Sequence, residues 1–191
     1  MRFIKSPSSD ELNRELKREQ YKTKYRRTLI STIFVLITAA AAAVLVATLW
    51  LPVLRIYGAS MSPTLKEGET VVSVKNGNYE AGDVIAFYYG NKLLVKRYIA
   101  GPGSWVDIQE DGTVTVDGVS LDEPYLKEKA YGYCDLTLPY QVPEGKYFLM
   151  GDQRATSVDS RHSSVGCIAE EAIVGKIVLR IWPWESFGWI S

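Results

Sequence analysis

Hydrophobic residues are arranged along this chain in two ways, first as one long uninterrupted run and then as many short runs. Residues 29–51 contain no charged side chain, and Pro52 follows them directly. A helix over this run would be roughly 35 Å long, enough to cross the roughly 30 Å hydrocarbon core of a bilayer with some tilt. The pattern therefore predicts one N-terminal transmembrane helix.

Two other interpretations of residues 29–51 compete with a membrane anchor. The small residues of the alanine run would suit a cleaved secretory signal, but the apolar segment is longer than a usual signal core. A buried core helix is rarely apolar on every side over such a length. We therefore favour an uncleaved anchor.

After Pro52 the hydrophobic runs are short and rich in β-branched and aromatic residues, which is typical of strands. The clearest turn signal between them is Asp117-Gly118, because a type I′ hairpin turn needs positive φ at both central residues. No stretch predicts a helix of three turns, and 122–129 would form one or two turns at most. We expect a mainly β fold, an antiparallel domain at 52–191 with strands near 69–74, 83–89, 92–99, 113–116, 146–150 and 172–182.

The neutral total charge hides a basic arm joined to an acidic body. Residues 1–28 carry nine basic and four acidic residues, a net +5, and the rest of the chain carries a net −5. An acidic body argues against nucleic acid as its partner. Under the positive-inside rule the arm faces the cytoplasm, and residues 52–191 face the outside.

The sequence contains two cysteines, Cys134 and Cys167. A location outside the cell would permit a disulfide between them, but two partly buried free thiols fit equally well. Their spacing is not that of a metal site.

Two serines, Ser60 and Ser62, follow the predicted anchor in the stretch GASMSPTL. Pro63 biases Ser62 toward an extended conformation and fixes the following turn, so the Ser60 hydroxyl and backbone N–H can both be exposed. A nucleophilic serine uses both groups, since the oxygen attacks and the N–H can bind the oxyanion. Most serines near a proline are only turn residues, so spacing alone leaves the role of Ser60 open.

Two side chains compete as the base that would activate such a serine. His162 is the single histidine, and Asp159 or Asp152 could orient it in a Ser-His-Asp arrangement, although a lone histidine in a polar loop is often solvated. The alternative is Lys96, which strand alternation places on the opposite face from Arg97, so that we expect only one of these two cations to point inward. To act as a base near neutral pH, Lys96 would need a pKa well below the ordinary value of about 10.4, and burial can lower the pKa that far.

Four boxes in this order resemble those of bacterial type I signal peptidases, over residues 29–183. They read SMSPTL at 60–65, GDVIAF at 82–87, VKRYIAGPG at 95–103 and MGDQRATSVDSR at 150–161. The resemblance implies a serine endopeptidase, anchored in the bacterial cell membrane, whose extracytoplasmic domain removes signal peptides through a Ser-Lys dyad and an acyl-enzyme. Its partners would be preproteins emerging from the secretion machinery and the lipid bilayer, with no metal or organic cofactor.

The resemblance also assigns roles by position. It implies Ser60 as the nucleophile and Lys96 as the general base. It implies that Ser157 orients the lysine amine, that Asp159 and Arg161 form a bracing ion pair, and that Gly151 and Asp152 belong to the same structural box. A shallow pocket for the small residue before the cut would be formed by Ile56, Met61, Leu65 and Val95.

Several positions depart from the family pattern without removing a catalytic group. Gly58 stands where some members carry a serine that donates to the oxyanion, so the second oxyanion donor is left open. Gln153 replaces an asparagine, and Ser104 replaces an aspartate. The segment 105–145 corresponds to a small β extension that is short here, as expected of a single-anchor form.

Two other classes of function compete with a peptidase. A non-catalytic relative could act as an assembly factor or chaperone for surface proteins, but a binding module does not need both Ser60 and Lys96. A self-cleaving Ser-Lys regulator of the repressor type would be linked to DNA and would lack the anchor. The aromatic tail leaves a further choice, between a lipid interface and packing under the last strand, for Trp182, Trp184, Phe187 and Trp189.

Overall fold

The computed structural model describes residues 9–75 and 77–190, and of residues 11 and 47–50 only the backbone. The chain divides into an N-terminal unit that ends at Ala47 and a second unit that begins at Thr48. The first unit is a single helix, α1 (Ser9–Trp50). Residues 1–8 of the predicted basic arm lie outside the described residues.

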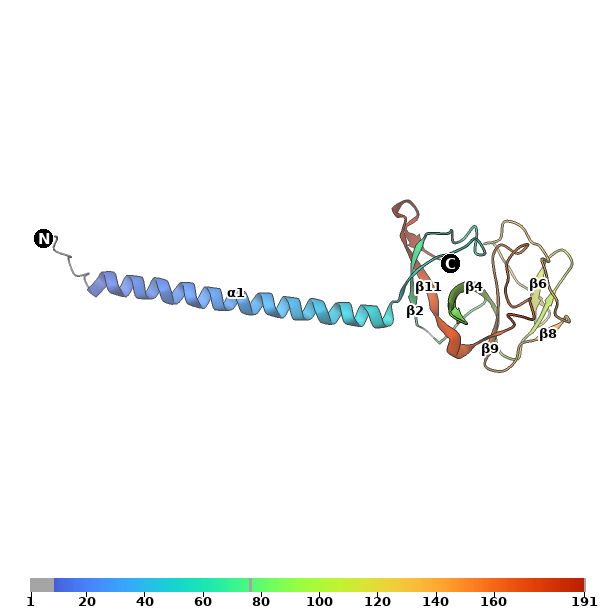
Figure 1. Cartoon of the computed structure of the whole chain (residues 1–191), viewed down its shortest axis with the longest axis horizontal. Helices are drawn as coiled ribbons and strands as arrows, with labels where there is room; N and C mark the ends of the chain where they lie inside the picture. The colour runs from blue at the N-terminus through green and yellow to red at the C-terminus, as the bar shows by residue number, and fades with distance from the viewer. Residues whose placement is uncertain (1–8, 76, 191) are drawn as a thin grey trace. The chain divides into compact units, whose positions relative to one another are not determined.

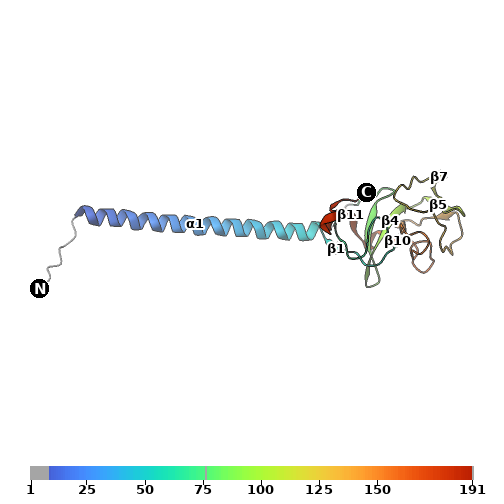
Figure 2. The same cartoon turned by 90° about the horizontal axis from the view of Figure 1, so that it is seen from above.

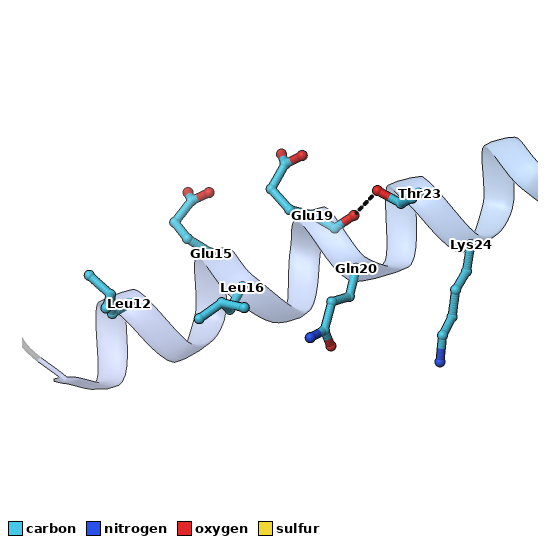
Figure 3. Close-up of a pocket in the computed structure, with 7 residues that line it drawn as sticks. All are labelled: Leu12, Glu15, Leu16, Glu19, Gln20, Thr23 and Lys24. Atoms are coloured by element: carbon cyan, nitrogen blue, oxygen red, sulfur yellow. Dashed lines mark hydrogen bonds between the residues drawn. The ribbon is translucent and has the colours of Figure 1, made fainter.

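Helix α1 is longer than the predicted anchor, because it continues from the apolar run through the described part of the basic arm (Figure 1). Within the arm, charged side chains one turn apart form pairs such as Lys22–Glu19 at 2.8 Å. Figure 3 shows residues 12–24 of this helix, where the Thr23 hydroxyl donates to the Glu19 carbonyl oxygen at 2.8 Å. By length and composition, one helix among the described residues is able to cross a membrane, and its span is Leu12–Val46.

The second unit contains two antiparallel sheets (Figures 1 and 2). The larger has the strand order β1-β2-β11-β3-β4-β9-β10, with β12 also paired to β11, and the smaller has the order β7-β6-β5-β8. Their bounds are β1 (Val53–Arg55), β2 (Thr70–Val74), β3 (Val84–Tyr89), β4 (Lys92–Ala100), β5 (Trp105–Ile108), β6 (Val114–Val116), β7 (Val119–Ser120), β8 (Tyr140–Gln141), β9 (Lys146–Met150), β10 (Ile168–Ala169), β11 (Ile173–Trp182) and β12 (Gly188–Trp189), with short 3₁₀ turns η1 (Glu170–Ala172) and η2 (Trp184–Ser186). The fold is therefore mainly β and antiparallel, with one N-terminal apolar helix.

Strand β4 separates two hydrophobic clusters and leaves part of one edge unpaired. Leu93 and Val95 pack with the cluster that contains Ile56, whereas Leu94 packs on the cluster of Ile85 and Phe87. Residues 92–97 of β4 pair with β3 on one edge. On the other edge, β9 pairs with β4 only from Arg97 onward. The other edge of residues 92–96 is thus free of strand partners among the described residues.

Six strands coincide with the sequence predictions, and the Asp117-Gly118 hairpin is confirmed. Asp117 has φ 52° and Gly118 has φ 81°, and the turn joins β6 to β7. The segment 122–129 forms turns and bends rather than a helix. The four strands of the smaller sheet all fall inside the predicted 105–145 extension, but the division of 52–191 into domains stays a prediction.

The aromatic side chains at the C-terminal end are exposed to different extents, and the alternative that half of them pack under the last strand stays untested. Trp184 is 72% exposed and Trp189 is 80% exposed, and the other two rings are more than half exposed. Trp184 stacks on Phe187 with 6.4 Å between ring centroids. Trp182 and Trp184 also meet edge to face, with 6.3 Å between ring centroids.

Candidate active site

Ser60 lies on a tight turn that follows β1 and is held from both sides. The turn is closed by hydrogen bonds from the Ser62 N–H to the Ala59 carbonyl at 3.0 Å and from the Leu65 N–H to the Met61 carbonyl at 2.8 Å. Met61 and Leu65 are buried in the core beneath it. The Ser60 carbonyl accepts the Gln153 N–H at 3.0 Å, which ties this turn to the segment 151–161.

Lys96 is buried at the centre of β4, with 5% of its surface exposed. Its Nζ donates to Ser157 Oγ at 3.0 Å. Burial lowers the pKa of Lys96 to about 8, and this effect outweighs the attraction of Asp159, which would raise the pKa. Lys96 and Ser60 line the same cavity of about 630 Å³, so an amine that readily loses its charge shares a chamber with the exposed serine turn.

Ser157 connects the lysine amine to a buried ion pair. Its hydroxyl bonds to the Asp159 carboxylate, which also accepts the Gly151 N–H at 2.9 Å. Arg161 binds both carboxylate oxygens, through Nε at 2.9 Å and Nη2 at 3.0 Å. Burial alone would raise the pKa of Asp159, but Arg161 and these hydrogen bonds hold the pKa below its ordinary value. The hydroxyl is therefore oriented by an anion and faces the lysine with a fixed geometry.

Gly151 and Asp152 begin the segment that carries this ion pair. A Cβ at Gly151 would overlap with the Ser157 hydroxyl and the Ser60 carbonyl oxygen, so only glycine fits between the two. Asp152 points elsewhere, to Arg97, and accepts from its Nε at 2.9 Å and its Nη2 at 2.8 Å. Asp152 also accepts the Thr64 hydroxyl at 2.5 Å, so it joins β4 to the serine turn that Gly151 contacts.

Arg97 corrects the prediction that only one of the two cations on β4 points inward. Lys96 and Arg97 face opposite sides, as predicted, but Arg97 is fully buried. Apart from its pairing with Asp152, its guanidinium donates to the Gly82 carbonyl and lies 3.6 Å from the centroid of the Tyr125 ring. The prediction was wrong because β4 is covered on both faces, so alternation alone does not expose either side chain.

A narrow groove of about 30 Å³ runs beside Ser60, between the segment that contains β1 and the unpaired part of β4. Of the four predicted pocket residues, Ile56, Met61 and Val95 line it, while Leu65 lies wholly buried below in the same hydrophobic cluster. Strand β1 pairs only with β2, so the groove lies between two edges without strand partners in the described chain. An extended peptide could enter it and pair with either edge.

The family model described as "Signal peptidase, peptidase S26" matches residues 27–182. The chain belongs to this family. It is 40% identical over 152 residues to signal peptidase IB of Staphylococcus aureus (strain COL), covering 69% of this chain and 78% of that protein. It is 37% identical over 164 residues to signal peptidase I of Bacillus amyloliquefaciens, covering 79% and 84%.

A solved structure of a signal peptidase I from Enterococcus faecalis V583 is also similar, with 32% identity and a TM-score of 0.45. The match covers 52% of this chain and 96% of that chain. The S26 family is one of serine peptidases, so the chain is a peptidase and a hydrolase.

In this S26 peptidase the single histidine contacts Tyr133 and the backbone of Asp159. His162 stacks on Tyr133 with 4.8 Å between ring centroids, and its Nδ1 accepts the Asp159 N–H at 3.5 Å. Cys134 and Cys167 are both free thiols, so the free-thiol alternative is confirmed. Within the described ranges, no three His, Cys, Asp or Glu side chains gather as a metal site would require.

Sequence reasoning missed the part of this peptidase's site that comes from the segment 122–131. Glu123 forms a buried ion pair with Arg154, whose Nε also donates to the Gly151 carbonyl at 3.1 Å. The Tyr125 hydroxyl donates to Glu123 at 2.9 Å. Arg154 lies within the box at 150–161 and could have been proposed as a site residue. The turn-rich sequence around Glu123 gives no signal that it is the partner of Arg154.

Proposed function

We propose that this S26 peptidase is a membrane-anchored endopeptidase that removes signal peptides from exported preproteins, with Ser60 as nucleophile and Lys96 as general base. The observation that carries the proposal is the buried Lys96 amine, which bonds Ser157 and lines one cavity with Ser60. With a pKa of about 8, roughly one lysine in ten is uncharged at pH 7 before substrate binds. Covering the cavity with a peptide would increase that fraction.

The proposed reaction proceeds through a covalent intermediate. Neutral Lys96 accepts the Ser60 proton while Ser60 Oγ bonds to the scissile carbonyl carbon, and the Ser60 N–H stabilises the oxyanion. The protonated Lys96 then gives its proton to the leaving amine as the C–N bond breaks, which leaves an ester on Ser60. Neutral Lys96 next takes a proton from water, the hydroxide attacks the ester carbonyl, and Ser60 recovers its proton as the C–O bond breaks.

Substrate binding in this proposal uses the groove between β1 and the unpaired part of β4. The segment before the cut would lie there in extended form and form backbone hydrogen bonds as an added strand. The groove is narrow, and Ile56, Met61 and Val95 leave room only for small side chains. We therefore expect small residues such as alanine at the first and third positions before the cut.

Membrane anchoring in the proposal rests on α1 and on charge. The helix is apolar over 29–46 without a charged residue, and the described arm before it is rich in lysine and arginine, which favours a cytoplasmic arm. The exposed rings Trp182, Trp184, Phe187 and Trp189 are of the kind that settle at a lipid interface. The catalytic unit would then work on the outer surface of the bacterial cell membrane.

The assignment of the base is tested with the full-length protein in detergent and a preprotein substrate. Lys96→Ala should lower kcat/KM by about a thousandfold or more, because the proton of Ser60 then has no acceptor. His162→Ala should leave most of the activity. If Lys96→Ala cleaves normally and His162→Ala is inactive, the histidine is the base. If folded parent protein cleaves no preprotein at all, a non-catalytic binding role is correct instead.

A further inference from the structure

The cavity that contains Ser60 and Lys96 extends well beyond these two residues. It has a volume of about 630 Å³, whereas the groove on the other side of the free β4 edge has about 30 Å³. Its remaining lining comes from the end of β3, the start of β4 and the loop 156–165. These lining residues are Ala59, Tyr89, Asn91, Lys92, Leu94, Thr156, Val158 and Val165.

Strand alternation divides the two hollows between the two faces of β4. Leu93 and Val95 line only the narrow groove, Lys92 and Lys96 line only the large cavity, and Leu94 borders both. A peptide paired to the free edge of β4 would alternate in the same way, because successive side chains of a strand point to opposite faces. If its first and third side chains before the cut enter the narrow groove, its second and fourth must enter the cavity.

The direction of the bound peptide follows from where the free edge lies. Beyond Lys96 the edge of β4 is taken by β9, which pairs from Arg97 onward. A strand with its scissile bond at Ser60 can therefore pair only on the side that leads back from Lys96 to Lys92. The large cavity extends in that same direction.

We propose that this cavity is a specificity subsite for the second and fourth residues before the cut, and that Lys92 selects an acidic side chain at the fourth. The inference rests on the proposed function and deepens it. A first side chain in the narrow groove lies level with Val95, which lines that groove. Lys92 is three residues before Val95, about 10 Å along a strand, so the fourth side chain reaches the level of Lys92.

The chemistry of the lining differs along the cavity. Near Leu94, Val158 and Val165 it is apolar, so a large apolar side chain can be accommodated at the second position. At the far end Lys92 is exposed, and no acidic side chain is among the lining residues. The Tyr89 hydroxyl donates to the Ser164 carbonyl at 2.6 Å and holds β3 to the loop, which gives this end of the cavity a fixed wall.

The charge preference is tested with a matched series of peptides, identical except for Glu, Ala or Lys at the fourth position before the cut. The full-length parent in detergent should cleave the Glu peptide about two- to fivefold faster than the Lys peptide in kcat/KM, the range expected of an exposed ion pair. Lys92→Glu should reverse this ratio. Lys146→Glu, which changes an exposed lysine outside the cavity, should keep the parent ratio.

A second series tests the volume of the cavity, with Phe in place of Ala at each of the first three positions. Phe at the second position should be tolerated within about threefold, and Phe at the first or third should abolish cleavage. Val158→Trp should selectively lower cleavage of the peptide with Phe at the second position.

The outcomes separate this inference from the proposed function. An unchanged Glu-to-Lys ratio in Lys92→Glu would overturn the assignment of the fourth position. Equal rejection of Phe at all three positions would show that the second side chain does not enter the cavity. Lys92→Glu could instead alter the preference for the residue after the cut, and that result would also contradict the inference. Failure of the parent to cleave any of the peptides would be a failure of the proposed function itself.

Discussion

Lys96 and Arg97 show how neighbouring cations on one strand meet burial differently. An arginine keeps its charge at any physiological pH, so its burial requires a counter-ion, and Asp152 supplies one with two hydrogen bonds. A lysine can lose its proton, and Lys96 instead faces a hydroxyl, Ser157. Arg97 therefore remains charged and structural, whereas Lys96 is available for proton transfer.

The pH dependence of cleavage should report the Lys96 amine. Because the proposed base must be uncharged, kcat/KM should rise about tenfold per pH unit below its pKa and level off above it. With the pKa lowered by burial to about 8, the bend should lie near that value. A pH–rate profile with a small peptide checks this. A profile that is flat between about pH 6 and about pH 10 would contradict a lysine base.

Replacing the two cations with methionine should change stability in opposite directions. The buried Lys96 amine has no directly bonded counter-ion among the described residues and destabilises the fold where it is charged, so Lys96→Met should raise the free energy of unfolding by about 1–3 kcal/mol at pH 7. The sign follows from the lowered pKa: between about 8 and 10.5 the unfolded state binds more protons, so the parent gains stability with rising pH and its deficit disappears.

Arg97→Met is the matched comparison and should lower the free energy of unfolding by about 3–5 kcal/mol, because Asp152 would be left buried without its partner. Denaturant unfolding of the full-length protein in detergent measures both variants. Equal destabilisation by the two changes would mean that the Lys96 amine contributes to the fold as a charged group.

At the scale of elements, the segment 122–131 supports three arginines of the candidate site from outside the large sheet. Tyr125 lies against the Arg97 guanidinium, and Glu123 pairs with Arg154. Further along, the Tyr131 carbonyl accepts Arg161 Nη1 at 2.7 Å. One irregular segment thus contacts three arginines, and each of these also holds part of the segment 151–161.

Substitutions at Tyr125 should separate the contribution of its ring from that of its hydroxyl. Tyr125→Phe keeps the ring beneath Arg97 and should cost about 0.5–1.5 kcal/mol for the lost hydrogen bond to Glu123. Tyr125→Leu also loses the cation–π contact and should cost about 0.5–2 kcal/mol more. If the ring positions β4, Tyr125→Leu should lower kcat more than it raises KM, and Tyr125→Phe should restore kcat. A Leu variant with unchanged kcat would limit Tyr125 to stability.

The strands show which elements a sequence pattern can predict. Strands β2, β3, β4, β9 and β11 have five or more residues and enough β-branched or aromatic positions to be recognised. Strands β7, β8, β10 and β12 have two residues each, too few for any alternation to appear. Strand β1 follows the anchor and Pro52 directly, and nothing in its three residues marks a strand.

At the scale of the whole molecule, the sequence predicted which segments come together around the candidate site but not which side chains support them. The boxes at 60–65, 95–103 and 150–161 are brought together, as the resemblance implied. Glu123 and Tyr125 could not be placed, because their partners are about thirty residues away in sequence and periodicity carries no information across that separation. The expectation that only one of Lys96 and Arg97 points inward failed for the same reason, since the Tyr125 ring that covers Arg97 comes from a distant segment.

The two unpaired edges beside Ser60 have a consequence for what this peptidase can reach. A chain enters the groove only by giving up its own secondary structure over several consecutive residues, since each edge needs backbone groups that are not already bonded. A folded cargo domain has no such stretch to offer, while the flexible connector upstream of it does. The peptidase would thus distinguish the flexible connector from the folded domain first by conformation, and only then by the chemistry of the side chains.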